Sequence, residues 1–119
     1  MKVMGNGLKL TESQEQVAVV EYCEWRRIPC FHIPNGGHRE KHTAYQMKRQ
    51  GVKAGVPDLC IPVARKGFHG LYIEMKRADG GRPTAEQRGW LRLLVDNGYC
   101  AEVCHGAEEA IALIDGYMS

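Results

Sequence analysis

Two carboxylates and a lysine stand in this chain where a folded hairpin could bring them together. Asp58 closes the segment Gly55-Val56-Pro57-Asp58, and Glu74-Met75-Lys76 begins sixteen residues after it. Because side chains alternate along a strand, Glu74 and Lys76 would leave it on one face, with Cα atoms roughly 6.5 Å apart. If the strands that carry them pair, Asp58, Glu74 and Lys76 share one end of a sheet.

This arrangement is typical of a divalent-metal site that hydrolyses phosphodiesters. Two adjacent carboxylates repel each other unless a cation lies between them, and hard oxygen ligands suit Mg²⁺ or Mn²⁺. Such an ion activates water and screens charge on a phosphate, and a neighbouring lysine can position or deprotonate the attacking water. Each motif alone could be an edge strand with an exposed Glu/Lys pair or a turn before a strand. The prediction therefore depends on both motifs occurring together.

The elements that must position these groups follow from periodicity, caps and breakers. Thr11 is a good N-cap with Gln14 at the capping-box position, and Pro29 stops the helix that follows. The predicted order is αβαββαβα, an α/β sandwich with a mixed central sheet flanked by helices. The predicted helices are 12–27, 41–50, 85–98 and 107–117, and the predicted strands are 30–33, 59–63, 71–77 and 99–104.

Five motifs in this order resemble those of a known family. They are Ile33-Pro34-Asn35-Gly36-Gly37-His38, Gly55-Val56-Pro57-Asp58, Glu74-Met75-Lys76, Pro83-Thr84-Ala85-Glu86-Gln87 with Trp90-Leu91, and Gly98-Tyr99-Cys100-Ala101-Glu102-Val103. From about Thr11 to Tyr117 the chain resembles the virus-type replication-repair nuclease (VRR-NUC) domain of the PD-(D/E)XK nuclease superfamily. The resemblance implies one nuclease domain over 1–119 with a restriction-endonuclease-like sandwich.

The resemblance also implies roles for individual residues. Asp58 and Glu74 would bind Mg²⁺ or Mn²⁺ directly, with the backbone carbonyl of Met75 as a further ligand. Lys76 would position and activate the attacking water. Gln87 would face the scissile phosphate, although an ordinary polar residue in a first helical turn would look the same.

The first helix is expected to supply a third acid. In the family a glutamate lies four residues before a glutamine, and Glu12 with Gln16 fits this spacing on one helix face. Glu15 is the alternative, since it also points towards the buried stripe. Both are first-turn acids that favour the helix dipole, whatever else they do.

A basic segment and the loop before it are the predicted DNA contacts. Between 39 and 53 the net charge is +4, from Arg39, Lys41, Lys48, Arg49 and Lys53 against Glu40. Two glycines in the preceding loop would allow close backbone approach to a ligand. The expected contacts are Asn35, His38, Arg39, Lys41 and Lys53, although a solvated helix face would give the same charge pattern. Trp25 and Trp90 are expected in the core.

Composition agrees with an ordinary folded protein. The chain has 119 residues, 44% of them apolar and 25% charged, and a net charge of +2 that does not by itself indicate a nucleic-acid binder. It shows neither a membrane-spanning run nor the apolar region of a signal peptide, so we expect a cytoplasmic protein of a bacterial or phage-infected cell. The five cysteines lack metal-ligand spacing and are expected to be reduced thiols, mostly buried.

The resemblance implies a function at the level of substrate. Small members of the family look like homodimers that cut branched DNA, Holliday junctions in particular, and the short chain suits a phage or mobile-element protein. Two alternatives stay open: a module that binds branched DNA without cutting, and a nuclease of other specificity, restriction-type or acting on flaps or linear DNA. The sequence leaves open the choice of Mg²⁺ or Mn²⁺ and the number of ions.

Overall fold

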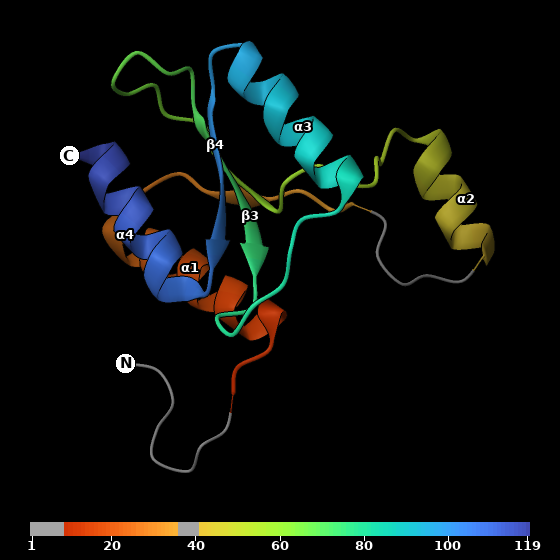
Figure 1. Cartoon of the computed structure of the whole chain (residues 1–119), viewed down its shortest axis with the longest axis horizontal. Helices are drawn as coiled ribbons and strands as arrows, with labels where there is room; N and C mark the ends of the chain where they lie inside the picture. Colours follow the sequence, from red (N-terminus) through yellow and green to blue (C-terminus); the bar gives the residue numbers. More distant parts are fainter. Residues whose placement is uncertain (1–8, 36–40) are drawn as a thin grey trace.

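The computed structural model describes residues 9–35 and 41–119, and its elements follow the predicted order (Figure 1). The helices are α1 (Glu12–Arg26), α2 (Lys41–Arg49), α3 (Ala85–Asp96) and α4 (Ala107–Met118). The strands are β1 (Phe31–His32), β2 (Leu59–Ile61), β3 (Leu71–Lys76) and β4 (Cys100–His105). The predicted α/β architecture is confirmed.

The sheet is mixed, as predicted, with the strand order β1-β2-β3-β4. The first three strands pair antiparallel, whereas β4 runs parallel to β3. A parallel pair needs a crossover connection, and α3 supplies it. Leu59 lies opposite Ile73 in the β2–β3 ladder, so the preceding Asp58 comes level with Glu74.

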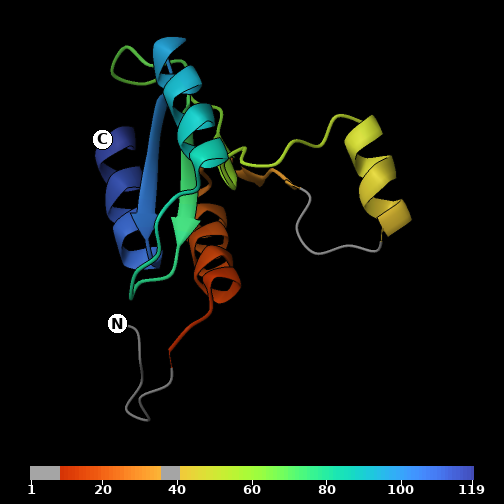
Figure 2. The ribbon, with the colours of Figure 1, turned by 45° about the vertical axis from the view of Figure 1, so that its right-hand side comes forward.

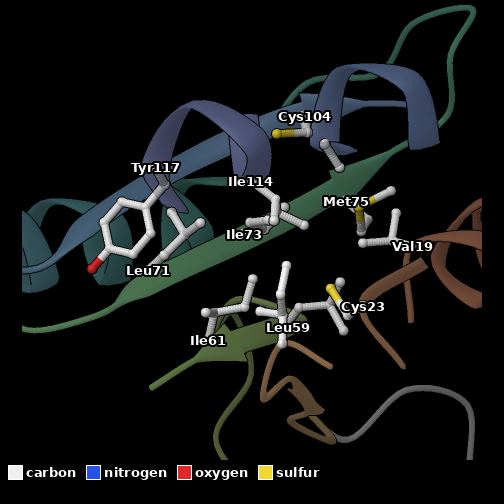
Figure 3. Close-up of a cluster of buried hydrophobic side chains, with 12 residues drawn as sticks. Val19, Cys23, Leu59, Ile61, Leu71, Ile73, Met75, Cys104, Ile114 and Tyr117 are labelled. Atoms are coloured by element: carbon white, nitrogen blue, oxygen red, sulfur yellow. The ribbon is translucent and has the colours of Figure 1, made fainter. Parts of the chain in front are cut away.

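One face of the sheet forms the hydrophobic core with α1 and α4 (Figure 3). Alternate residues of β3 point into it, because Leu71, Ile73 and Met75 are fully buried. The residues that meet them from other elements include Leu59 and Ile61 of β2, Val19 and Cys23 of α1, and Ala110, Ile114 and Tyr117 of α4. The intervening side chains of β3, Tyr72, Glu74 and Lys76, therefore face the opposite side, which α3 covers.

Both α1 and α3 begin with a capping box. The Thr11 hydroxyl accepts from the backbone N–H of Gln14, whose side chain accepts from the backbone N–H of Thr11. This confirms the predicted start of α1. Thr84 and Gln87 repeat the arrangement at the start of α3.

Three strands are shorter than the sequence predicts, although β3 loses only its last residue, Arg77. β2 ends at Ile61 rather than Val63, because Pro62 has no N–H to donate to the ladder. β1 is reduced to Phe31–His32. The prediction that Trp25 belongs to the core is wrong, since 78% of that residue is exposed on α1. Trp90 is half-buried.

α2 lies to one side of the sheet (Figures 1 and 2). None of its residues is buried, although one of its faces is distinctly more apolar than the other. The five cysteines are free thiols; Cys23, Cys60 and Cys104 are buried, and Cys30 and Cys100 are half-buried. Within the two described ranges, every helix is too short or too polar to cross a membrane.

Gly55 fixes the loop before Asp58 against the start of α3. Its φ is +91°, a conformation that residues with a Cβ rarely adopt, and a Cβ built there would lie 2.9 Å from the backbone carbonyl carbon of Glu86. Neither backbone can move without shifting the element that carries it. The close approach of the loop to α3 therefore requires glycine.

We expect Gly55→Ala to lower the free energy of unfolding by more than the ~1–2 kcal/mol that positive φ costs an ordinary residue. Gly51→Ala is the matched control, because Gly51 has φ +101° but a Cβ added to it would meet no atom within 4 Å. Urea unfolding of both variants measures the difference. Equal losses would show that the contact with Glu86 adds nothing.

Candidate active site

The β2–β3 register brings the two predicted acids together at one end of the sheet. Asp58 is 8% exposed and Glu74 is 1% exposed. Burial raises the pKa of Glu74 to about 8, and the negative charge of Asp58 adds to this shift while Lys76 opposes it. The charge of Glu12 raises that pKa further. The site therefore holds more negative charge than its own cation balances.

The two oxygens of Glu74 have different surroundings. Oε2 accepts a hydrogen bond from Gln87 Nε2 at 3.0 Å and lies 3.7 Å from Lys76 Nζ. Oε1 is buried and has no hydrogen-bond partner in the described part of the chain. A buried carboxylate oxygen without a partner is costly unless something outside the protein binds it.

The capping box of α3 fixes the orientation of Gln87. Its Oε1 accepts from the backbone N–H of Thr84 at 2.8 Å. Because that oxygen is already used as an acceptor, the amide nitrogen must point the other way, towards Glu74. The first turn of α3 therefore positions the amide of Gln87 as a donor to Oε2 of Glu74. Oε1 of Glu74 receives no donor from it.

Backbone contacts hold Asp58 in place from two sides. Its Oδ2 accepts from the backbone N–H of Met75 at 2.8 Å, inside the buried end of β3. Its carbonyl oxygen accepts from the backbone N–H of Ile33 and from Nδ1 of His32, both at 2.8 Å. Since a carbonyl can only accept, Nδ1 carries the proton in this contact. The carboxylate is thereby fixed relative to Glu74.

This donor set fits a hard divalent cation. Oxygens of Asp58 and Glu74 would serve as ligands for Mg²⁺ or Mn²⁺, which would offset the excess negative charge and meet the free Glu74 Oε1. Lys76, whose side chain is 13% exposed, lies beside them as a general acid–base group or as a charge for a phosphate. Such an arrangement is suited to the hydrolysis of a phosphodiester.

Comparison with known proteins identifies the family. Residues 10–108 match the model of the VRR-NUC domain. The chain belongs to the VRR-NUC family. A solved structure titled "VRR_NUC domain protein" is 33% identical in sequence and superposes with a TM-score of 0.80, over 93% of this chain and 90% of that one. No curated protein matches the chain.

Membership implies a nuclease of the PD-(D/E)XK type. Asp58, Glu74 and Lys76 are the residues predicted for that signature, and the structure brings all three together with Gln87. Met75 turns its side chain into the core and its N–H to Asp58. Its carbonyl stays a predicted ligand.

The two candidate acids of α1 occupy different places. Glu15 is 6% exposed, and its Oε1 accepts a hydrogen bond from the backbone N–H of Ala107 at 2.8 Å. This contact caps the start of α4, because the N-cap residue there, Gly106, has no side chain that could accept the bond. The charge of Glu12, by contrast, acts on Glu74. The contact with Ala107 gives Glu15 a structural role, and Glu12 stays the predicted acid of the site.

The predicted DNA contacts lie in three places: near the loop that carries Asp58, on α2 with the loop after it, and outside the described residues. Asn35 Nδ2 donates to the carbonyl of Val56 at 3.5 Å, two residues before Asp58. Lys41 is the exposed first residue of α2, and Lys53 is exposed in the loop that returns from α2. His38 and Arg39 lie outside the described residues.

Sequence reasoning missed His32. Its Nδ1 donates to the carbonyl of Asp58, and the side-chain amide of Gln16 lies 3.1 Å from the same nitrogen, so His32 lies between α1 and the acid-bearing loop. A single histidine in a short strand carries no spacing signal. The only sequence hint was Gln16, which the family pattern placed one turn after Glu12.

We expect the metal-free protein to lose stability as pH rises from about 4.5 to about 8. Over this range the folded state keeps the Glu74 proton that the unfolded chain has released, so stability is full below the lower value and falls towards the upper one. Urea unfolding at several pH values, in EDTA, measures the slope.

Glu74→Gln should flatten this dependence, because an amide has no proton to release. Glu102→Gln, at an exposed position on β4, should leave it unchanged. Added Mg²⁺ should stabilise the native chain at pH 8 but not the Glu74→Gln variant. A slope that survives Glu74→Gln would assign the effect to another group.

Substitution of Glu15 should lower the stability of the protein, whereas substitution of Glu12 should lower its nuclease activity. Glu15→Ala is expected to cost about 1–2 kcal/mol of stability through the lost cap, and Glu15→Gln, which keeps an acceptor oxygen, to cost less. Glu12→Gln should leave thermal unfolding nearly unchanged and lower nuclease activity. Loss of activity in a fully stable Glu15→Gln variant would reverse the assignment.

Proposed function

We propose that this VRR-NUC domain is a metal-dependent, structure-selective DNA endonuclease that hydrolyses phosphodiester bonds in Holliday or other branched junctions. The observation that carries the proposal is Glu74, buried beside Asp58 and Lys76 with one oxygen held and the other free. A structural ion pair would satisfy both oxygens. The free oxygen of this carboxylate supports a role as a metal ligand.

Asp58, Glu74 and the carbonyl of Met75 would hold Mg²⁺ or Mn²⁺. When bound, the ion would supply Lewis-acid chemistry, withdrawing charge from the phosphate and acidifying water. The protein residues keep the ligands in place: the Met75 N–H fixes Asp58, and the Gln87 amide fixes Glu74.

The remaining residues act on the water and the phosphate. Lys76 Nζ, tethered near Glu74 Oε2, would orient the attacking water or take its proton and stabilise charge on the phosphorus centre. Gln87 would meet the scissile phosphate with its amide protons. Glu12 would act through water, at the edge of the acidic group.

The basic surface is proposed to bind the DNA backbone. Residues 41–53 contain four Lys or Arg residues and no acid, and phosphate contacts from Lys41 and Lys53 would orient the strand. Asn35, His38 and Arg39 would contact the DNA beside the acids. A homodimer with two-fold symmetry would present two sites to strands of opposite polarity, as a junction requires.

We expect cleavage of a labelled four-way junction in Mg²⁺ or Mn²⁺, none in EDTA, and slower cleavage of a matched duplex or single strand. Lys76→Gln should reduce the cleavage rate by roughly 10²-fold or more, the scale of general acid–base and electrostatic contributions. Gel analysis of the products measures both effects.

Lys66→Gln is the matched control, because it removes the same charge from the hairpin at the far end of β2 and β3. It should cut at the native rate. Tight junction binding without cutting in either metal would replace the enzyme with a binding module. Equal cutting of junction and duplex would leave a nuclease of other specificity.

A further inference from the structure

A groove of about 400 Å³ lies between α2 and α3. Its lining combines an aromatic ring, Trp90, with apolar side chains such as Met47 and Val52, and with the lysines Lys48 and Lys53. Trp90 is half-buried, so part of its indole is open to the groove, while both lysines are exposed. The volume falls within the roughly 300–1,000 Å³ of small-molecule sites.

These groups match the parts of one nucleotide. Base–aromatic stacking tolerates any base, because every base has a π-face, and exposed lysines suit its phosphates. Glu86 also lines the groove, and a carboxylate can accept hydrogen bonds from the exocyclic amino group of a base. The charges therefore suit a base inside the groove and phosphates at its rim.

Two chain segments connect the groove with the acids. Glu86 precedes Gln87, which donates to Glu74, and Trp90 follows one turn later on α3. On the other side, the lining residue Ala54 begins the loop that reaches Asp58, and Asn35, another lining residue, donates to the carbonyl of Val56. Through the close contact of Gly55 with Glu86, these two segments form one unit.

We infer that this groove receives the base of an unpaired nucleotide next to the scissile phosphate, stacked on Trp90 with Lys48 and Lys53 on the adjoining phosphates. The inference rests on the proposed function and gives a physical reason why the enzyme would prefer branched DNA to a fully paired duplex. Unstacking a base costs least where it is already unpaired, as at a branch point. A fully paired duplex would have to open before it could fill the groove.

A second copy of the chain could cover the same apolar surface. The nucleotide is favoured because Lys48 and Lys53 line the groove, and because its residues Glu86 and Asn35 neighbour the segments that hold Glu74 and Asp58. A self-association surface needs neither feature. The oligomeric state therefore enters the test as a competing outcome.

The test compares Trp90→Leu, which keeps apolar volume without a π-face, with Trp90→Phe, which keeps the π-face. Affinity is measured in EDTA, by fluorescence anisotropy, for a junction with one unpaired nucleotide at its centre and for a paired duplex. Trp90→Leu should weaken junction binding by roughly 5- to 100-fold, the range for loss of one stacked base. Trp90→Phe should retain most of it, and duplex binding should change little.

The second tryptophan provides both a control and a probe. Trp25, 78% exposed near the far end of α1 from Glu12, should be replaceable by Leu without effect on DNA binding. In a Trp25→Phe protein, Trp90 is the only tryptophan. Its emission should be quenched by the junction with the unpaired nucleotide and much less by the duplex.

The outcomes separate the two proposals. A native protein that neither binds nor cuts junctions overturns the proposed function. Cutting with unchanged Trp90 emission, or equal loss for junction and duplex in a folded Trp90→Leu variant, overturns the nucleotide groove alone. A Trp90→Leu variant with normal DNA affinity but a lower mass in sedimentation assigns the groove to a protein interface and likewise overturns the inference.

Discussion

The antiparallel register between β2 and β3 is the constraint on which the site depends. Leu59 opposite Ile73 places two fully buried side chains on the core face, and this pairing sets Asp58 level with Glu74 on the other face. A slip of one residue would turn every side chain of the strand over and exchange the acids for apolar groups. Packing on one side of the sheet thus decides the chemistry on the other.

The same register places a carboxylate where folding alone would not favour it. Glu74 is buried next to a second acid, so its ionised form is disfavoured until a cation is present. The protein compensates on one oxygen only, through Gln87 and Lys76. The capping box of α3 makes this possible, because Thr84 uses the acceptor end of Gln87 and thereby orients the donor end.

The sequence could predict what depends on local periodicity. Alternation along 71–76 placed Glu74 and Lys76 on one face, and Thr11 with Gln14 marked the start of α1, because both signals lie within a few residues. Contacts between distant segments carry no such signal. In the sequence, Glu12 and Glu15 look alike, because both lie in the first turn of a helix. Only the fold distinguishes them, by placing the distant Ala107 beside Glu15. Trp25 was misplaced because apolarity predicts burial, whereas this helix position faces solvent.

α2 is connected to the sheet through loops and contributes no buried residue to the described structure. Substitutions there leave the hydrophobic core untouched, so natural variation can accumulate on this helix with little effect on folding. The acids and the lysine, by contrast, are buried or nearly buried at the packed sheet, where substitutions are costly. With the proposed function, such a division would let a lineage change which nucleic acids it binds while the proposed catalytic residues stay the same. It also marks α2 as the segment to exchange between relatives when a different target is wanted.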